Sequence, residues 1–201
     1  MGLIGVETLI PLFMQNMREF TAFEAGLALL PGALVTGILA PIIGRIFDKI
    51  GARWLVLIGL LILTLSSFSF INLGPETTFT YITVMYSIRM LGLVMVMMPI
   101  QTAALNQLPK RLIPHGAAMD NTMRMIGASV GTAILVTVMT TTTMYAEQRP
   151  EVLYPDILGA NMAFIVVAVL TLLALILSFF IKYNKPVEEN IQSNAVNASS
   201  Q

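Results

Sequence analysis

The chain alternates long apolar runs with short polar segments. Uncharged runs cover residues 25–44 and 54–75, and each has roughly the ~20 residues that an α-helix needs to cross a bilayer. Similar runs begin near residues 1, 79, 116 and 157. The pattern therefore predicts an all-α membrane protein with six transmembrane helices. We expect them at residues 1–16, 26–44, 54–73, 79–104, 116–139 and 157–181, with the first helix cut short.

A basic island, residues 44–53, separates the second run from the third. Its length predicts a tight connector at one membrane face. Its three basic side chains place that face in the cytoplasm, because cytoplasmic loops are enriched in lysine and arginine. These side chains are Arg45, Lys49 and Arg53.

The same island holds two glycines and one acid. Gly44 and Gly51 suit backbone turns in which a side chain would clash. Asp48 is the only carboxylate of the island, and it could cap a helix end or form a salt bridge.

The basic residues divide unevenly between the two predicted faces. Only Arg18 and Arg149 fall on the outer side, and Arg89 and Arg124 fall within spans. This asymmetry predicts that both termini are cytoplasmic. We expect a bundle over residues 1–182 and a disordered cytoplasmic tail over residues 183–201, which is rich in Asn and Ser. The seven inner residues are Arg45, Lys49, Arg53, Lys110, Arg111, Lys182 and Lys185.

Composition agrees with a membrane protein and narrows the chemistry. The chain is 56% hydrophobic and 11% charged, whereas soluble domains carry about 25% charged residues. It has no cysteine and a formal net charge of zero, so nothing points to a disulfide, a cysteine metal site or nucleic acid. The single histidine, His115, lacks a second ligand nearby. The sequence shows no zinc motif, phosphate loop or nucleophile elbow, so we expect no enzyme activity, no metal and no cofactor.

Charged residues inside spans are the strongest functional signal, because a charge at the bilayer centre costs roughly 2.5–3.5 kcal/mol. Glu7 lies eight residues before Gln15, which we place near the outer face, and is thus ~12 Å deep. Arg89 lies ~15 Å from the same face, and Arg124 lies ~12 Å from the inner face. Transporter binding sites are expected at this depth.

These charges differ in the partners that the sequence offers them. Asp120 and Arg124 are four residues apart, so they share a helix face and can neutralise each other. Arg89 has no acid within a turn of its own helix and needs a partner elsewhere, such as Glu7, another part of the transporter or a substrate. Glu7 has no local basic partner, so it could be a proton carrier, a fixed partner of Arg89 or an artefact of the shortened first helix.

The island resembles a family signature. Its pattern Gly-x-x-x-Asp-Lys-x-Gly-x-Arg is similar to the cytoplasmic loop of the major facilitator superfamily, although Ala52 replaces a residue that is often basic. Segments 10–16, 26–32, 88–92 and 121–127 look like segments of the drug:proton antiporters with fourteen spans. These segments include Gln15, Asn121 and Arg124.

The resemblance covers nearly the whole chain and points to the C-terminal six-helix half of such an antiporter. It implies that the first and fourth helices line a central cavity, that the third and sixth lie outside, and that Asp48 contacts the other half. It also implies export of cationic or lipophilic drugs at a bacterial cell membrane, with the proton gradient as energy source.

The second and fifth spans are both rich in Gly and Ala and run in opposite directions, as two inverted three-helix repeats would.

Other functions remain open at the level of sequence. The chain could belong to a facilitator for another solute, such as a lipid precursor or a peptide. It could also be a membrane fragment or interaction partner that transports nothing. The expected partners are the bilayer, the N-terminal half or a second copy of the chain, and lipophilic or cationic small molecules.

Overall fold

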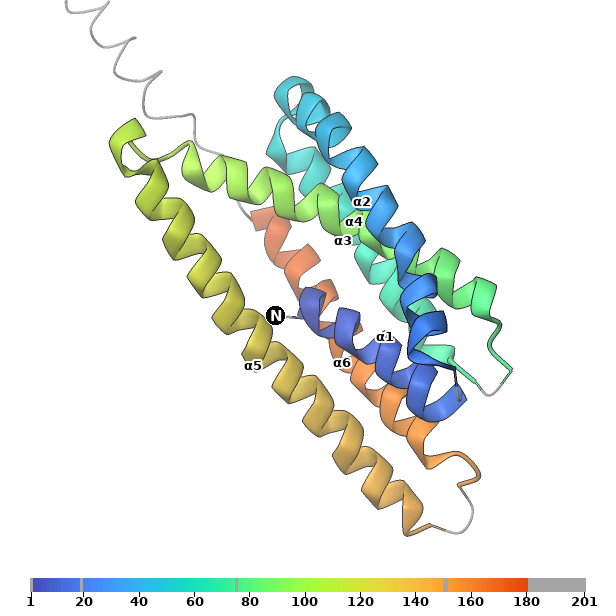
Figure 1. Cartoon of the computed structure of the whole chain (residues 1–201). Helices are drawn as coiled ribbons and strands as arrows, with labels where there is room; N and C mark the ends of the chain where they lie inside the picture. Colours follow the sequence, from blue (N-terminus) through green and yellow to red (C-terminus); the bar gives the residue numbers. More distant parts are fainter. Residues whose placement is uncertain (1, 19, 75, 150–151, 181–201) are drawn as a thin grey trace, which may run out of the picture.

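The computed structural model describes residues 2–18, 20–74, 76–149 and 152–180, and the predicted tail lies outside this part. The described residues form α-helices joined by short connectors and two 3₁₀ turns (Figure 1). The helices are α1 (Gly2–Arg18), α2 (Ala22–Ile50), α3 (Ala52–Ser69), α4 (Phe79–Leu105), α5 (Ile113–Glu147) and α6 (Pro155–Phe180), and the turns are η1 (Phe70–Asn72) and η2 (Lys110–Leu112).

Five of these helices are long and apolar enough to cross a membrane: α2, α3, α4, α5 and α6. α1 has 17 residues, which corresponds to ~25 Å of helix. The all-α membrane architecture is thus confirmed, whereas a spanning first helix stays a prediction.

The start of α2 is fixed by a reciprocal cap. The Glu24 amide donates to Thr21 Oγ1 at 3.3 Å, and the Thr21 amide donates to Glu24 Oε2 at 2.8 Å. Each side chain thereby satisfies a backbone N–H that the first helical turn leaves without a partner. The chain therefore enters α2 at a defined point, directly after α1.

The prediction that residues 44–53 form a connector is wrong in its extent. α2 continues through this island to Ile50, and α3 begins at Ala52, so the turn is made by Gly51 alone. Gly51 has φ +83° and ψ 169°, a conformation open almost only to glycine. Gly44, expected at a turn, is helical because i to i−4 hydrogen bonds continue past the end of the apolar run.

The expected end of the fifth span at residue 139 is also wrong. α5 remains helical to Glu147, and the connector to α6 begins only at Gln148. Thr140 donates its hydroxyl to the Val136 carbonyl at 2.9 Å. A threonine can thus satisfy its side chain within a helix, so the threonine run does not end α5.

The main buried cluster brings together side chains of α1, α2, α4, α5 and α6 with η1. Phe13 of α1 and Phe164 of α6 are both buried, and the Phe164 ring stacks on Phe70 of η1 at 5.3 Å between centroids. Ala160 and Ala163 are buried on the same face of α6. Such small residues allow helices to approach closely in lipid.

α3 and α4 approach most closely at two glycines that face each other. A Cβ added to Gly59 would lie 2.9 Å from the Gly92 carbonyl oxygen, and a Cβ added to Gly92 would lie 3.0 Å from the Gly59 carbonyl oxygen. The absence of both side chains allows this crossing. It sets the distance between the two helices on which the buried arginine and its partner lie.

The prediction that α3 lies on the outside of the bundle stays a prediction, and only one face of the helix is exposed. Trp54, Ile58, Leu61, Leu65 and Phe68 are exposed along it, at the spacing of one helical stripe. The opposite face packs against α4 and α6. In Figure 1, the turn at Gly51 and the α4–α5 connector lie at the upper end, while the α5–α6 connector lies at the lower end.

Candidate functional site

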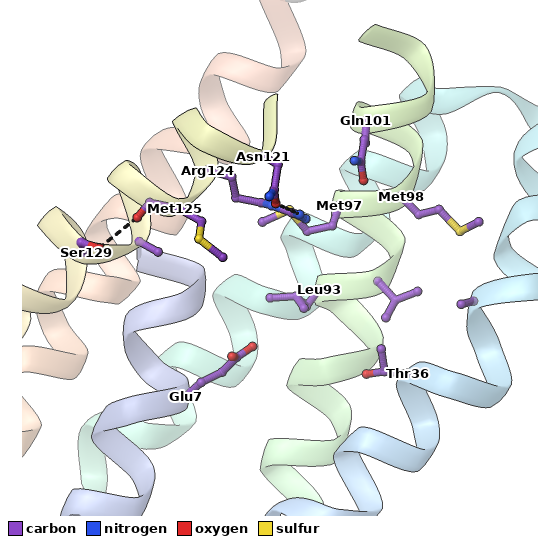
Figure 2. Close-up of a pocket in the computed structure, with 13 residues that line it drawn as sticks. Glu7, Thr36, Leu93, Met97, Met98, Gln101, Asn121, Arg124, Met125 and Ser129 are labelled. Carbon is purple, nitrogen blue, oxygen red and sulfur yellow. Dashed lines mark hydrogen bonds between the residues drawn. The ribbon is translucent and has the colours of Figure 1, made fainter. Parts of the chain in front are cut away.

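A cavity of about 600 Å³ opens between α1, α2, α4 and α5. Figure 2 shows that each of these helices contributes at least one polar side chain beside a wall of methionine and leucine. In the described part of the chain, α3 and α6 contribute no lining residue. The lining residues are Glu7, Thr36, Ala40, Leu93, Val94, Met97, Met98, Gln101, Asn121, Arg124, Met125, Ala128 and Ser129.

Helical spacing explains which positions reach the cavity. On α4, Leu93, Met97 and Gln101 are four residues apart and form one face. On α5, Asn121, Met125 and Ser129 are likewise four residues apart, and Arg124 lies three residues after Asn121. Residues three or four apart lie side by side on a helix, so each helix presents a continuous strip to the cavity.

Three polar lining residues were missed by reasoning from sequence: Thr36, Gln101 and Ser129. They carry no charge and therefore stand out little from an apolar run. Helical spacing could have predicted two of them. Gln101 lies two turns beyond Leu93 on the cavity face of α4, and Ser129 lies about two turns beyond Asn121 on the cavity face of α5.

Arg124 finds its partner within α5. Its Nη2 donates to Asn121 Oδ1 at 2.8 Å (Figure 2). Asp120, the partner that spacing suggests, is half-buried. In the described part of the chain, Asp120 does not line the cavity, and Arg124 donates to Asn121 and not to Asp120. The guanidinium therefore lies at the cavity with a neutral amide beside it.

Arg89 lies behind the cavity wall. Its side chain is 1% exposed, and its Nη1 donates to Ser67 Oγ on α3 at 2.7 Å. Ser67 in turn donates to the Leu63 carbonyl at 2.7 Å. This chain of hydrogen bonds fixes the guanidinium against α3, so Arg89 does not line the cavity although its depth suggested that it would.

Glu7 connects this buried arginine to the cavity. Its carboxylate lines the cavity and interacts electrostatically with Arg89 and with Tyr86, which lies one turn before Arg89 on α4. Tyr86 packs on Gly32 of α2, where an added Cβ would lie 2.6 Å from its ring. Glu7 is thus one of the partners that Arg89 was predicted to need.

The remaining predicted residues lie away from this cavity in the described structure. Gln15 is exposed on α1. Arg45, Lys49 and Arg53 are exposed at the end of α2 and the start of α3. The Asp48 side chain is outside the described part, so its contact with another transporter half stays a prediction.

Residues 1–132 match the model of the Major Facilitator Superfamily. The chain belongs to this family, and its long apolar helices make it a multi-pass membrane protein. The fold of one cavity-forming helix bundle, with two charged residues at the cavity, fits this class of membrane transporter.

Curated relatives include named transporters and resistance proteins. The chain is 48% identical over 188 residues to the uncharacterized MFS-type transporter YcnB of Bacillus subtilis, which covers 93% of this chain and 40% of the relative. It is 34% identical over 191 residues to the lincomycin resistance protein LmrB of Listeria monocytogenes, covering 92% and 41%. It is 32% identical over 132 residues to the multidrug export protein EmrB of Haemophilus influenzae, covering 65% and 26%. The chain spans about 40% of the length of the first two relatives.

Proposed function

We propose that this chain forms the C-terminal six-helix half of a proton-coupled multidrug efflux transporter of a bacterial cell membrane. The observation that carries the proposal is the cavity between α1, α2, α4 and α5, where a few polar and charged groups stand in an apolar wall. Such a composition is typical of small-molecule sites. Family membership and the resistance relatives support export as the activity.

The cavity wall suits substrates of varied shape. Met97, Met98 and Met125 line it together with Leu93. Thioether side chains are flexible and polarizable, so they adapt to ligands that differ in outline. The polar groups at the rim would orient a substrate, and the methionines would hold its apolar body.

Proton coupling is assigned to Glu7. It is the one carboxylate among the described lining residues, and Arg89 faces it from the buried side. Uptake of a proton by Glu7 would weaken its attraction for Arg89, and substrate binding at the cavity would change the same balance. The proton gradient then supplies the energy for export. In the proposed orientation, both chain termini lie in the cytoplasm.

Exchange of segments between relatives tests this proposal. The segment of Bacillus subtilis LmrB that matches this chain, 190 residues at 35% identity, is replaced by this chain, and lincomycin accumulation is measured in cells. We expect the chimera to lower accumulation relative to LmrB lacking the segment, and a protonophore to abolish the difference. Glu7→Gln should remove export without lowering the amount of chimera in the membrane.

Two results would contradict the proposal. A chimera that reaches the membrane in normal amount but leaves accumulation at the level of the deletion would count against the transport function. Export by the chimera that persists in the presence of the protonophore would count against proton coupling.

A further inference from the structure

The two charged side chains that line the cavity are not equivalent. Glu7 comes from α1 and Arg124 from α5, and Figure 2 shows them at separate parts of the cavity. Glu7 has a charged partner within the protein, Arg89. Arg124 instead has a neutral partner, the Asn121 amide. This difference decides which charge is available to a ligand.

The charge of Glu7 is compensated from behind the wall. Arg89 is buried and held by Ser67, and it interacts electrostatically with the Glu7 carboxylate. A buried guanidinium needs such a counter-charge, because an unbalanced charge in low dielectric is costly. A cationic ligand at Glu7 would therefore compete with Arg89 for the same carboxylate.

The charge of Arg124 is left available to the cavity. Its guanidinium donates to the Asn121 amide oxygen at 2.8 Å, and this amide carries no net charge. A guanidinium has five N–H donors, so this bond leaves donors for a ligand. The Asn121 amide also has N–H donors of its own, and Gln101 and Ser129 add polar groups to the same cavity.

From this difference, and resting on the proposed transport function, we infer that the cavity takes an amphipathic anion. The acidic group of the ligand, a carboxylate, sulfonate or phosphate, binds Arg124 and Asn121. Its apolar body lies against Met97, Met98 and Leu93. A planar guanidinium suits this role because it binds oxyanions through two parallel N–H donors.

A matched pair of fluorescent probes tests the charge preference. 1-Pyrenebutyrate and 1-pyrenebutylamine have the same apolar body and opposite charge. Binding of each is measured by equilibrium dialysis against the full chain in phosphatidylcholine nanodiscs, with empty discs subtracted for partition into lipid. We expect the carboxylate to bind about tenfold more tightly than the amine.

Variants of α5 link the preference to Arg124. Arg124→Ala should weaken the binding of 1-pyrenebutyrate about tenfold. Arg124→Lys should weaken it less, because lysine keeps the positive charge but lacks the two parallel N–H donors of the guanidinium. Asp120→Asn should tighten it, because a neighbouring negative charge is removed. Arg53→Ala is the matched control, since Arg53 is exposed outside the cavity and its loss should change nothing.

A change of lipid composition tests whether the bound anion is a membrane lipid or a soluble organic acid. Discs that contain phosphatidylglycerol are compared with phosphatidylcholine discs for the wild type and for Arg124→Ala. If phosphatidylglycerol weakens the binding of 1-pyrenebutyrate to the wild type but not to Arg124→Ala, the site belongs to an anionic lipid. Equal binding in both discs assigns it to a soluble organic acid.

Three results overturn the inference. Tighter binding of the amine, lost in Glu7→Gln, shows a cation site and leaves the proposed transport function standing. An Arg124→Ala variant that binds 1-pyrenebutyrate like the wild type excludes the proposed anchor. Binding of neither probe above empty discs excludes the cavity as a ligand site of this chain, whereas the transport proposal is decided by the accumulation assay on the chimera.

Discussion

Substitution of Gly59 by alanine tests whether the close crossing of α3 and α4 sets the geometry of the site. The added Cβ would lie 2.8 Å from Val96 Cγ2, 2.9 Å from the Gly92 carbonyl oxygen and 2.9 Å from Met95 Cβ. Two of these three atoms belong to the backbone or are fixed to it, so rotamer changes cannot relieve the clash. The helices must move apart by several tenths of an ångström to restore ordinary contact.

The expected loss of stability follows from two opposing terms. Overpacking in a well-packed interior costs about 1–3 kcal/mol, and alanine gains roughly 0.5–1 kcal/mol over glycine in a helix. The net destabilisation by Gly59→Ala should be about 1–2 kcal/mol. For a chain of this length each kcal/mol lowers Tm by about 2–4 °C.

The control is Gly37→Ala on α2, where no atom lies within 4 Å of the added Cβ. Its Tm should equal or exceed that of the wild type, because only the propensity term acts. Thermal unfolding of the purified chain in detergent measures both variants. A Gly59→Ala variant as stable as Gly37→Ala would show that the helices do not cross as closely as described.

The same substitution should also impair the site. Gly92 lies one turn from Arg89 on α4, and the Arg89 bond to Ser67 crosses from α4 to α3 at 2.7 Å. Wider spacing would lengthen this bond and shift the guanidinium that faces Glu7. We therefore expect Gly59→Ala to reduce lincomycin export by the chimera more than Gly37→Ala does, at equal amounts in the membrane.

Three further predictions follow. Arg89→Ala should abolish export by the chimera while leaving its amount in the membrane unchanged or higher, because a costly buried charge is removed; normal export would refute a role for Arg89. In intact cells an impermeant maleimide should label Leu153→Cys and spare Ile50→Cys, both at exposed positions; labelling of Ile50→Cys would reverse the predicted orientation. Thr21→Ala should destabilise the chain by about 1 kcal/mol through loss of the cap, whereas Thr21→Ser should not; equal Tm values for the two variants would contradict the role of the cap.

The apolar runs predicted the helices well but not where they end. Span length follows from the energetics of the bilayer, which the sequence displays directly. Helix ends depend instead on backbone conformation. Gly44 and Gly51 look alike as residues, yet only Gly51 adopts a positive φ. The predicted connector was therefore centred on the right segment and was too long.

Charge within the spans predicted part of the cavity. Glu7 and Arg124, which were predicted from their charge, line it, and so does Asn121, which the family resemblance supplied. Depth along a helix did not reveal the direction of a side chain, so Arg89 falls at a plausible height but behind the wall. Spacing on one helix also suggested Asp120 for Arg124, whereas the nearer Asn121 accepts the bond. Rotation about the helix axis is set by packing between helices, which a single sequence does not display.

The helix contacts bear on how the acid and the base of the site come together. The principal pairs are α3 with α4, α2 with α4, α5 with α6, α3 with α6, α1 with α5, α1 with α6, α1 with α2, α2 with α3, and α4 with α5. Exchanging α1, α2 and α3 with α4, α5 and α6 leaves this set unchanged. Two inverted repeats, which stay a prediction, would produce such a set.

This exchange relates the two helices that carry Glu7 and Arg89. Glu7 lies on α1 and Arg89 on α4, and the exchange converts each of these helices into the other. Both helices also line the cavity, whereas α3 and α6, which the exchange likewise relates, pack against each other away from it. The two helices related by the exchange thus carry opposite charges that interact next to the cavity. If Glu7 is the proton carrier, a change in its protonation would alter the electrostatic interaction that links the first helices of the two predicted repeats.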